Sequence, residues 1–345
     1  MKALTYHGPG DLRPEQVADP GLLSPGDAII RVELAAICGS DLHVWHGREV
    51  GLDPGTVMGH EFLGEIVAVG KGVTRFRRGD RAVSPFTTSC GECFYCHKGL
   101  TARCTQGQLF GWVERGEGLH GGQAELVRVP LADATLLALP AGLAPEAALL
   151  LGDVLATGYH CATLAGITAE TTCAVIGCGP VGLLAVLAAA ELGAERIYAI
   201  DSVPERLTRA EQFGARTRAL PEEIREATEG RGVDAVLEAV GSAESMQLAF
   251  RLVRPGGTIA VVGVHHETVF PFSPAQAYDK NLTLRVGRCP ARAYMETLIP
   301  LASRKQGALQ SLFTHRVGLE STPEAYRMFA ERRDGCIKVA VVPAL

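Results

Sequence analysis

From about residue 171 onward, short apolar runs alternate with segments of helical spacing. The apolar runs are TCAVIG, RIYAID, DAVLEAV and GTIAVVG, and helix-like stretches such as VGLLAVLAAAEL and PERLTRAEQF lie between them. Near-continuous strands rich in Val, Ile and Ala, separated by helices, are typical of a parallel sheet that is covered on both faces. This part of the chain is therefore predicted to be a doubly wound α/β domain.

The first 150 residues follow a different pattern. Apolar runs such as AIIRVELAAI and LGEIVAVG are separated by Pro-Gly, Gly-Asp and Asp-Pro-Gly turns, with little 3.6-residue periodicity, so a mostly β domain is expected. After Gly287 the pattern is mixed, and the chain ends in IKVAVVP, an apolar strand that can return to the first domain. The pattern predicts one domain inserted into another.

One uncharged stretch, Thr171–Ala190, is long enough to be tested as a membrane span. Gly177, Gly179, Pro180 and Gly182 interrupt it and would break such a helix, so a buried strand that turns into a buried helix is the better interpretation. The N-terminus has no apolar run typical of a signal peptide, which favours a cytoplasmic protein.

Composition and charge narrow the function classes. The chain has 345 residues, of which 47% are hydrophobic and 21% charged, as expected of a globular protein with more than one domain. The formal net charge is −5 with the two signs interspersed, so no basic field favours nucleic acid or an anionic membrane. We therefore expect a small-molecule partner, with neither nucleic acid nor membrane involved.

A G-x-G-x-x-G motif closes one apolar strand and opens the next helix. Such glycines allow a tight turn and let the backbone approach a pyrophosphate at the N-terminus of a helix. Asp201 ends the following strand, where its carboxylate would accept hydrogen bonds from ribose hydroxyls and repel a 2′-phosphate, which favours NAD over NADP. The alternative is a glycine-rich turn and an Asp that only cap structure. The motif residues are Gly177, Gly179, Pro180, Val181 and Gly182.

Four cysteines lie within fifteen positions, separated by two, two and seven residues. Four thiolates close a tetrahedral zinc shell and leave no position for substrate, so this site is predicted to be structural. A ferredoxin-type iron–sulfur cluster needs a shorter last gap followed by Pro, whereas Thr105 follows here, and unmetallated thiols are the other alternative. His97 is expected to face solvent. The predicted ligands are Cys90, Cys93, Cys96 and Cys104.

Two further segments, CGSDLH and GHE, contain residue types that bind metals, but fewer of them than the cysteine lobe. Each segment alone is weak evidence for a metal site. Together with the other motifs they resemble the zinc-containing medium-chain alcohol dehydrogenases. The resemblance covers essentially the whole chain. It rests on CGSDLH at 38–43, GHEFLGEIVAVG at 59–70, GDRAV at 79–83, the four cysteines and GCGPVG at 177–182.

The resemblance implies a GroES-like catalytic domain over residues 1–153 and 289–345, interrupted by a Rossmann NAD-binding domain over residues 154–288. The structural zinc lobe is expected at about residues 88–106, and the cleft between the domains is expected to hold cofactor and substrate. Relatives are dimers or tetramers, so a homodimer or homotetramer is expected.

The resemblance also implies a catalytic zinc ion held by Cys38 and His60. Many relatives supply a second cysteine at the position that Asp153 occupies here, although members that resemble formaldehyde dehydrogenase also carry Asp there. One thiolate and one carboxylate cancel the charge of the ion as two thiolates would. Glu61 is the alternative third ligand, as in sorbitol dehydrogenase-like relatives, and we favour Asp153.

Further roles follow from the resemblance. Ser40 is expected to take the proton of the alcohol and pass it through the cofactor ribose to His43. The resemblance places Thr157 against the nicotinamide, Arg206 beside the adenosine ribose and Lys338 near the pyrophosphate.

Phe86 and Trp112 are candidate walls of the substrate pocket, with ordinary packing as the alternative for each. The expected reaction is zinc-dependent hydride transfer between an alcohol or polyol and NAD, which gives an aldehyde or ketone. A formaldehyde dehydrogenase or dismutase-like activity with tightly held NAD, and a non-catalytic NAD-binding redox sensor, are the alternatives.

Overall fold

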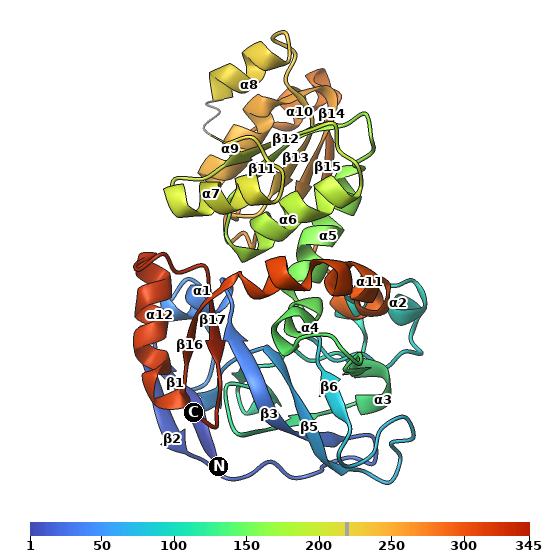
Figure 1. The fold of residues 1–345 in the computed structure, drawn as a ribbon, viewed down its shortest axis with the longest axis vertical. Coiled ribbons are helices and arrows are strands. Elements are labelled where there is room, and N and C mark those ends of the chain that lie inside the picture. Colours follow the sequence, from blue (N-terminus) through green and yellow to red (C-terminus); the bar gives the residue numbers. More distant parts are fainter. Residues whose placement is uncertain (218–220) are drawn as a thin grey trace. The chain divides into compact units, whose positions relative to one another are not determined.

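The structure is a computed structural model that describes residues 1–217 and 221–345. The chain forms two compact units (Figure 1). The discontinuous unit comprises Met1–Ala156 and Pro290–Leu345, and the inserted unit comprises Thr157–Cys289. The resemblance predicts the first boundary after residue 153 and the second after residue 288.

The discontinuous unit is mostly β, as its turn-rich sequence predicts. Its largest sheet has the strand order β10-β6-β5-β3-β17-β16, with β9 also paired to β3. The apolar C-terminal strand β17 pairs antiparallel with β3, so the end of the chain does return to this unit. These strands are β3 (Ala28–Ile37), β5 (Glu61–Val69), β6 (Arg81–Val83), β9 (Leu126–Val129), β10 (Leu137–Ala138), β16 (Phe313–Val317) and β17 (Lys338–Val341).

Smaller sheets and helices complete this unit. A three-stranded sheet has the order β2-β1-β4, and β7 pairs with β8. The strands are β1 (Lys2–Gly8), β2 (Asp11–Gln16), β4 (Thr56–Val57), β7 (Trp112–Glu114) and β8 (Glu117–Leu119). The α-helices are α1 (Asp41–Trp45), α2 (Phe94–His97), α3 (Ala132–Thr135), α4 (Pro145–Leu151), α11 (Ala291–Gln310) and α12 (Thr322–Glu331), with 3₁₀ turns at Thr101–Arg103 and Leu319–Ser321.

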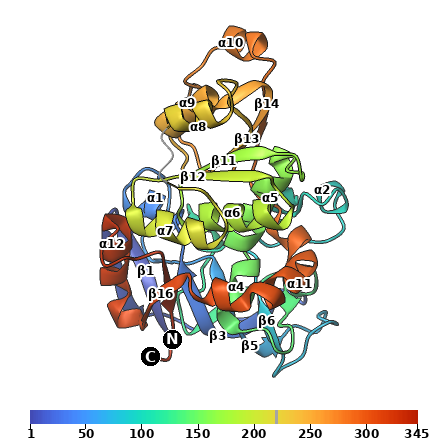
Figure 2. The same ribbon diagram turned by 45° about the horizontal axis from the view of Figure 1, so that its top comes forward.

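The inserted unit is the doubly wound α/β domain that the alternating pattern predicts. Its five strands are all parallel in the order β12-β11-β13-β14-β15, and Figure 2 shows α6 and α7 on one face and α8 and α9 on the other. The strands are β11 (Thr172–Ile176), β12 (Arg196–Ile200), β13 (Val233–Glu238), β14 (Val253–Val261) and β15 (Thr283–Val286). The helices are α5 (Val154–Ala165), which begins in the discontinuous unit, α6 (Pro180–Glu191), α7 (Pro204–Gln212), α8 (Pro221–Ala227), α9 (Ala243–Leu252) and α10 (Pro274–Asp279).

Two properties of the sequence can be compared directly with the structure. The uncharged stretch that we tested as a membrane span forms buried strand β11 and buried helix α6. Among the described residues no single helix has the length and apolar character that a membrane crossing needs; only the bent pair α4 and α5, taken together, meets those criteria.

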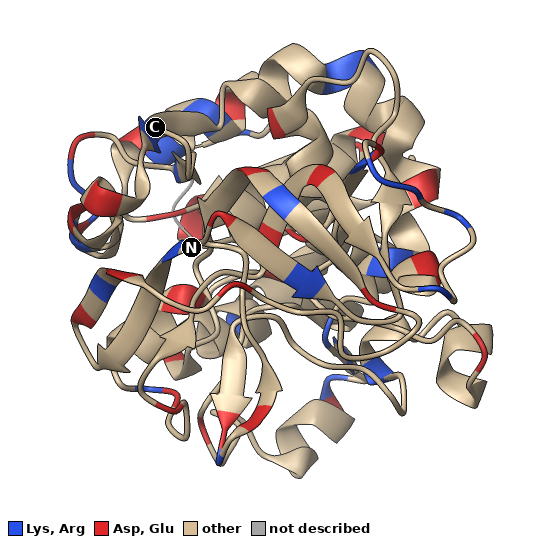
Figure 3. Cartoon of the chain, turned by 90° about the horizontal axis from the view of Figure 1, so that it is seen from below, with Lys and Arg blue, Asp and Glu red and all other residues tan. Residues whose placement is uncertain are grey.

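In Figure 3 acidic and basic residues are interspersed over the face that is drawn.

Candidate functional site

Four acidic or metal-ligating side chains from distant parts of the discontinuous unit converge. Each of these side chains offers one ligand atom, and the four atoms lie within 4.8 Å of one another. The residues are Cys38, His60, Glu61 and Asp153. Cys38 follows β3, His60 and Glu61 open the neighbouring antiparallel strand β5, and Asp153 follows α4. All four residues are at least 92% buried. We call this group the buried cluster.

The chemistry of the buried cluster suits a divalent cation. Asp153 Oδ2 lies 3.3 Å from both Cys38 Sγ and His60 Nε2. Burial, together with the nearby Asp153 and Glu61 carboxylates, raises the pKa of the Cys38 thiol to about 12. Glu61 Oε2 is buried without a hydrogen-bond partner among the described residues. Sulfur, imidazole and carboxylate donors together are the ligand types of zinc, so the residues fit that ion.

Asp41, which we did not single out from the sequence, holds two members of the buried cluster in place. Its Oδ1 lies 3.1 Å from His60 Nδ1, and its Oδ2 accepts a hydrogen bond from the Cys38 backbone N at 2.9 Å. Burial alone would lower the pKa of His60, but the Asp41 carboxylate and the hydrogen bond to Asp153 raise it well above its usual value. An engaged Nδ1 leaves Nε2 for a metal, as in carboxylate–histidine–zinc triads. The position of Asp41 within the CGSDLH motif was the sequence signal that could have identified it.

Ser40 also reaches the buried cluster. Its Oγ lies 3.2 Å from His60 Nε2. His43 follows within α1, and its backbone N donates a hydrogen bond to the Ser40 carbonyl at 3.0 Å. Phe86 lies edge-on to the His60 ring, with the ring centroids 6.4 Å apart. Trp112 is partly buried and packs against the hydrophobic core of this unit.

Lys338, which the resemblance places near the pyrophosphate, contacts the buried cluster in the structure. Its Nζ donates a hydrogen bond to Glu61 Oε1 at 2.7 Å, and both side chains are fully buried. A further contact joins Nζ to the Ile37 carbonyl at 3.4 Å. The cause is strand register, because β17 pairs with the end of β3 that precedes Cys38. Burial by itself lowers the pKa of Lys338, but the Glu61 carboxylate raises it, so the ammonium stays charged.

The four cysteines of the predicted lobe form a second group. Their sulfur atoms lie within 4.8 Å of one another, whereas His97 is exposed and outside the group. Backbone N–H groups point at these sulfurs, including Cys90 N to Cys104 Sγ at 3.2 Å and Cys93 N to Cys90 Sγ at 3.3 Å. Backbone hydrogen bonds lower the pKa of Cys93 to about 5, whereas burial raises that of Cys96 to about 12. Four converging sulfurs fit a closed tetrahedral site.

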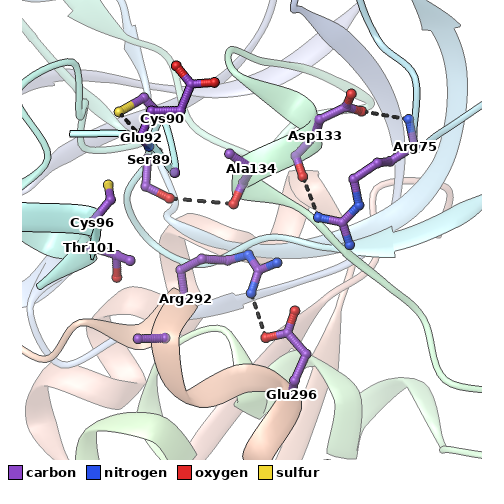
Figure 4. A pocket seen from close by; sticks show the side chains of 12 residues that line it. Arg75, Ser89, Cys90, Glu92, Cys96, Thr101, Asp133, Ala134, Arg292 and Glu296 are labelled. Carbon is purple, nitrogen blue, oxygen red and sulfur yellow. Dashed lines mark hydrogen bonds and ion pairs between the residues drawn. The ribbon is translucent and has the colours of Figure 1, made fainter. Parts of the chain in front are cut away.

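A cavity of about 460 Å³ adjoins this lobe (Figure 4). Cys90 and Cys96 contribute to its wall, and α11 supplies Arg292 and Glu296. The charges of α11 pair with each other, since Arg292 Nη1 lies 2.6 Å from Glu296 Oε2. Two cysteines of the lobe therefore line this cavity.

The glycine motif of the inserted unit has the geometry of a phosphate-binding turn. Gly177 has φ +85°, and a Cβ atom on Gly182 would lie 1.6 Å from the Gly177 carbonyl oxygen, so these two positions need glycine. Gly179 precedes Pro180 at the start of α6, and a Cβ there would meet only Arg206 Nη1, at 3.8 Å. The start of this twelve-residue helix therefore has open space at Gly179 and no side-chain cap, which fits a pyrophosphate.

Asp201 lies beside this turn. Its Oδ2 accepts a hydrogen bond from Cys178 N at 2.6 Å, and its Oδ1 accepts one from Val203 N at 2.9 Å. Arg206 Nη1 is 3.9 Å from the same carboxylate. The structure thus brings both predicted ribose-binding residues to the glycine turn. Thr157 is the first residue of the inserted unit and is buried in α5.

Comparison with known proteins identifies the family. The profile described as "Alcohol dehydrogenase GroES-like domain" matches residues 24–141, and "Zinc-binding dehydrogenase" matches residues 180–304. The zinc-type alcohol dehydrogenase B of Aspergillus flavus is 40% identical over 342 residues, which cover 95% of this chain and 78% of that protein. The NADP-dependent isopropanol dehydrogenase of Thermoanaerobacter brockii is 35% identical over 333 residues, covering 93% and 94%.

A solved structure agrees with this result. The alcohol dehydrogenase TADH from Thermus sp. ATN1 superposes with a TM-score of 0.92 at 38% identity, and 99% of each chain is covered. A GroES-like unit with an inserted parallel sheet defines the class of medium-chain dehydrogenases. This chain belongs to the zinc-type alcohol dehydrogenase family and is an oxidoreductase of that family. The fold class that the sequence predicts is thereby confirmed.

Proposed function

We propose that this protein oxidises an alcohol or polyol to an aldehyde or ketone with NAD, using a catalytic zinc ion held by Cys38, His60 and Asp153. The observation that carries the proposal is the convergence of a thiol, an imidazole and two carboxylates in one buried cluster. A bound zinc ion would supply Lewis-acid chemistry, which acidifies an alcohol hydroxyl and polarises a carbonyl. Cys90, Cys93, Cys96 and Cys104 hold a second, structural zinc ion.

Asp153 is the proposed third ligand in preference to Glu61. One oxygen of Glu61 is already hydrogen-bonded to Lys338, and separating that fully buried pair is costly. Asp153 Oδ2, in contrast, lies 3.3 Å from both of the other ligand atoms. Glu61 remains the alternative third ligand, because its Oε2 has no hydrogen-bond partner among the described residues.

The residues of α1 are assigned to proton movement and to ligand orientation. Asp41 accepts the Nδ1–H hydrogen bond of His60 and so aims Nε2 into the cluster. Ser40 Oγ, 3.2 Å from that nitrogen, is the atom that takes the hydroxyl proton of the substrate. His43, one turn along the same helix, passes the proton to solvent, because an imidazole exchanges protons near neutral pH.

NAD is the proposed cofactor. The open space at Gly179 supports a pyrophosphate at the start of α6, and the Asp201 carboxylate disfavours a 2′-phosphate. The preference for NAD over NADP needs a direct test for two reasons. The Arg206 guanidinium lies 3.9 Å from Asp201, and one relative is named as NADP-dependent. No specific observation favours the formaldehyde dehydrogenase-like activity or the non-catalytic sensor over the proposed reaction.

We also propose a homo-oligomer. β15 is an edge strand of the parallel sheet, and four large apolar side chains between residues 269 and 286 are exposed. Unpaired edge strands with apolar surroundings favour pairing with another chain. The exposed residues are Val269, Phe270, Tyr278 and Val286, and light scattering of the purified protein tests the expected dimer or tetramer.

The central test combines metal analysis with a substrate panel. We expect about two zinc ions per chain and NADH formation with one or more of primary alcohols, secondary alcohols, polyols and L-threonine, assayed in parallel with NADP. Asp153→Asn should lose activity and one zinc ion, whereas Glu61→Gln should keep that ion. One zinc ion, NADH binding and no turnover would instead support the sensor, and cofactor that survives purification would support the formaldehyde dehydrogenase branch.

A further inference from the structure

We propose that His265 is a positioning residue of the dinucleotide site, acting through the buried carboxylate of Glu238 so that its protonated form favours cofactor binding. The inference rests on the proposed NAD-dependent function. It concerns residues outside the glycine motif and outside both cysteine-containing clusters.

Glu238 is the last residue of β13 and is fully buried. Its Oε1 accepts three hydrogen bonds, from Val240 N at 2.8 Å, Gly241 N at 2.9 Å and Ser245 Oγ at 2.8 Å. A single carboxylate therefore sets the backbone course of the turn that follows β13 and joins it to the start of α9. We call residues 239–241 the β13 turn.

The β13 turn packs against the glycine motif. β13 is the neighbour of β11, and Ala239 N donates a hydrogen bond to the Ile176 carbonyl at 3.0 Å. A Cβ atom on Gly177 would lie 2.4 Å from Val240 Cγ2. Strand order reverses at β11, whose neighbours are β12 and β13, and ligands of doubly wound sheets bind at the carboxyl ends of the strands at such a point. Movement of the β13 turn therefore changes the shape of the proposed pyrophosphate site.

His265 closes the network from the loop after β14. Its Nε2 lies 3.3 Å from Glu238 Oε2, and its Nδ1 lies 2.9 Å from Glu267 Oε2. Glu267 Oε1 in turn accepts a hydrogen bond from Ala243 N, at the first residue of α9. Each ring nitrogen thus faces a carboxylate oxygen, and only the imidazolium has a proton for both.

Charge decides the direction of the effect. Two charged groups face His265, namely Glu238 from β13 and Glu267 from its own loop. Cys161 of α5 also lies near Glu238, but burial raises the pKa of its thiol, so Cys161 stays neutral and adds no charge. Hydrogen bonding to Glu238 raises the pKa of His265 above its ordinary value. When His265 loses its proton, a lone pair faces a carboxylate, and the Glu238 charge stays unbalanced beside the site of an anionic pyrophosphate.

The test is the dissociation constant of NADH, measured by fluorescence on the full-length, zinc-loaded protein between pH 6 and pH 9. We expect wild-type affinity to fall as the pH rises through the raised pKa of His265. His265→Gln keeps a donor to Glu238 but cannot become charged, so its affinity at pH 6 should be roughly 3- to 10-fold weaker, without that pH midpoint. Glu267→Gln should move the midpoint to lower pH.

His266→Gln is the matched control, because His266 is the adjacent, exposed imidazole and should leave the profile unchanged. Thermal unfolding of each variant separates positioning from a merely structural role, which would move the unfolding temperature without moving the pH midpoint. A wild-type profile without a midpoint, or an unchanged midpoint in His265→Gln, refutes the inference alone. A wild-type protein that binds NADH at no pH refutes the proposed function, and the inference with it.

Discussion

Replacing Lys338 with Met removes the ammonium group that donates a hydrogen bond to the buried carboxylate oxygen Glu61 Oε1. The two side chains are fully buried, and the Nζ–Oε1 distance is 2.7 Å. At that distance the Coulomb attraction is about 6 kcal/mol for an effective dielectric constant of about 20. Part of it is offset by the cost of burying both ions, and breaking such a pair costs about 3–5 kcal/mol. We therefore expect Lys338→Met to lower the free energy of unfolding by about that amount.

The double variant Glu61→Gln/Lys338→Met provides the decisive comparison. Because no buried charge is left alone, it should recover most of the loss, to within about 1.5 kcal/mol of wild type. The exposed Arg81–Glu33 pair in the same sheet is a matched control, and Arg81→Met should cost less than about 1 kcal/mol.

The pH dependence of Lys338→Met has a defined sign. Burial raises the pKa of Glu61, and loss of the opposing Lys338 charge raises it further. The folded variant then holds the Glu61 proton to a higher pH than the unfolded chain does, so its stability falls as the pH rises between the two pKa values. The destabilisation should be smaller at pH 5 than at pH 8.

Urea unfolding followed by tryptophan fluorescence measures these effects. Both tryptophans of the chain, Trp45 and Trp112, lie in the discontinuous unit, so the signal reports on the unit that holds the ion pair. Metal content must be matched between variants, because bound zinc also stabilises the fold. A loss below about 1 kcal/mol for Lys338→Met, or a double variant no more stable than the single one, would show that the ion pair is not the main determinant.

Four other variants test the buried cluster, the cysteine lobe and the glycine motif. Asp41→Asn should weaken zinc binding at the buried cluster by about 10- to 100-fold in chelator competition, and an unchanged affinity would exclude an orienting role. Cys104→Ser should reduce the metal content by one zinc ion per chain and lower the unfolding temperature while NADH binding persists; loss of both ions would contradict separate sites. Gly182→Ala should abolish NADH binding because its Cβ has no room. Gly179→Ala should weaken binding without lowering the unfolding temperature, and a fall in that temperature would contradict the open space at Gly179.

The local sequence determined the secondary structure of the inserted unit and the residues of the two short motifs. Apolar strands alternating with helices predict the parallel sheet of the inserted unit, because strand and helix have different side-chain periods. The four lobe cysteines lie within fifteen positions, and the glycine motif spans six, so short loops suffice to bring each set together. The returning strand β17 is also visible as an apolar run.

Strand register and side-chain packing decided the rest. Asp153 meets Cys38 across 115 positions, and Lys338 meets Glu61 across 277, so neither pairing has a local signal. The resemblance supplied Asp153 and placed Lys338 near the pyrophosphate, but only the pairing of β17 with β3 shows that the Lys338 ammonium lies against Glu61. The Glu238–His265 pair was missed for the same reason, whereas Asp41 lies only three residues from Cys38 and had a local signal in CGSDLH. Their roles depend on which atoms face each other after folding, and periodicity along the chain contains no information about that.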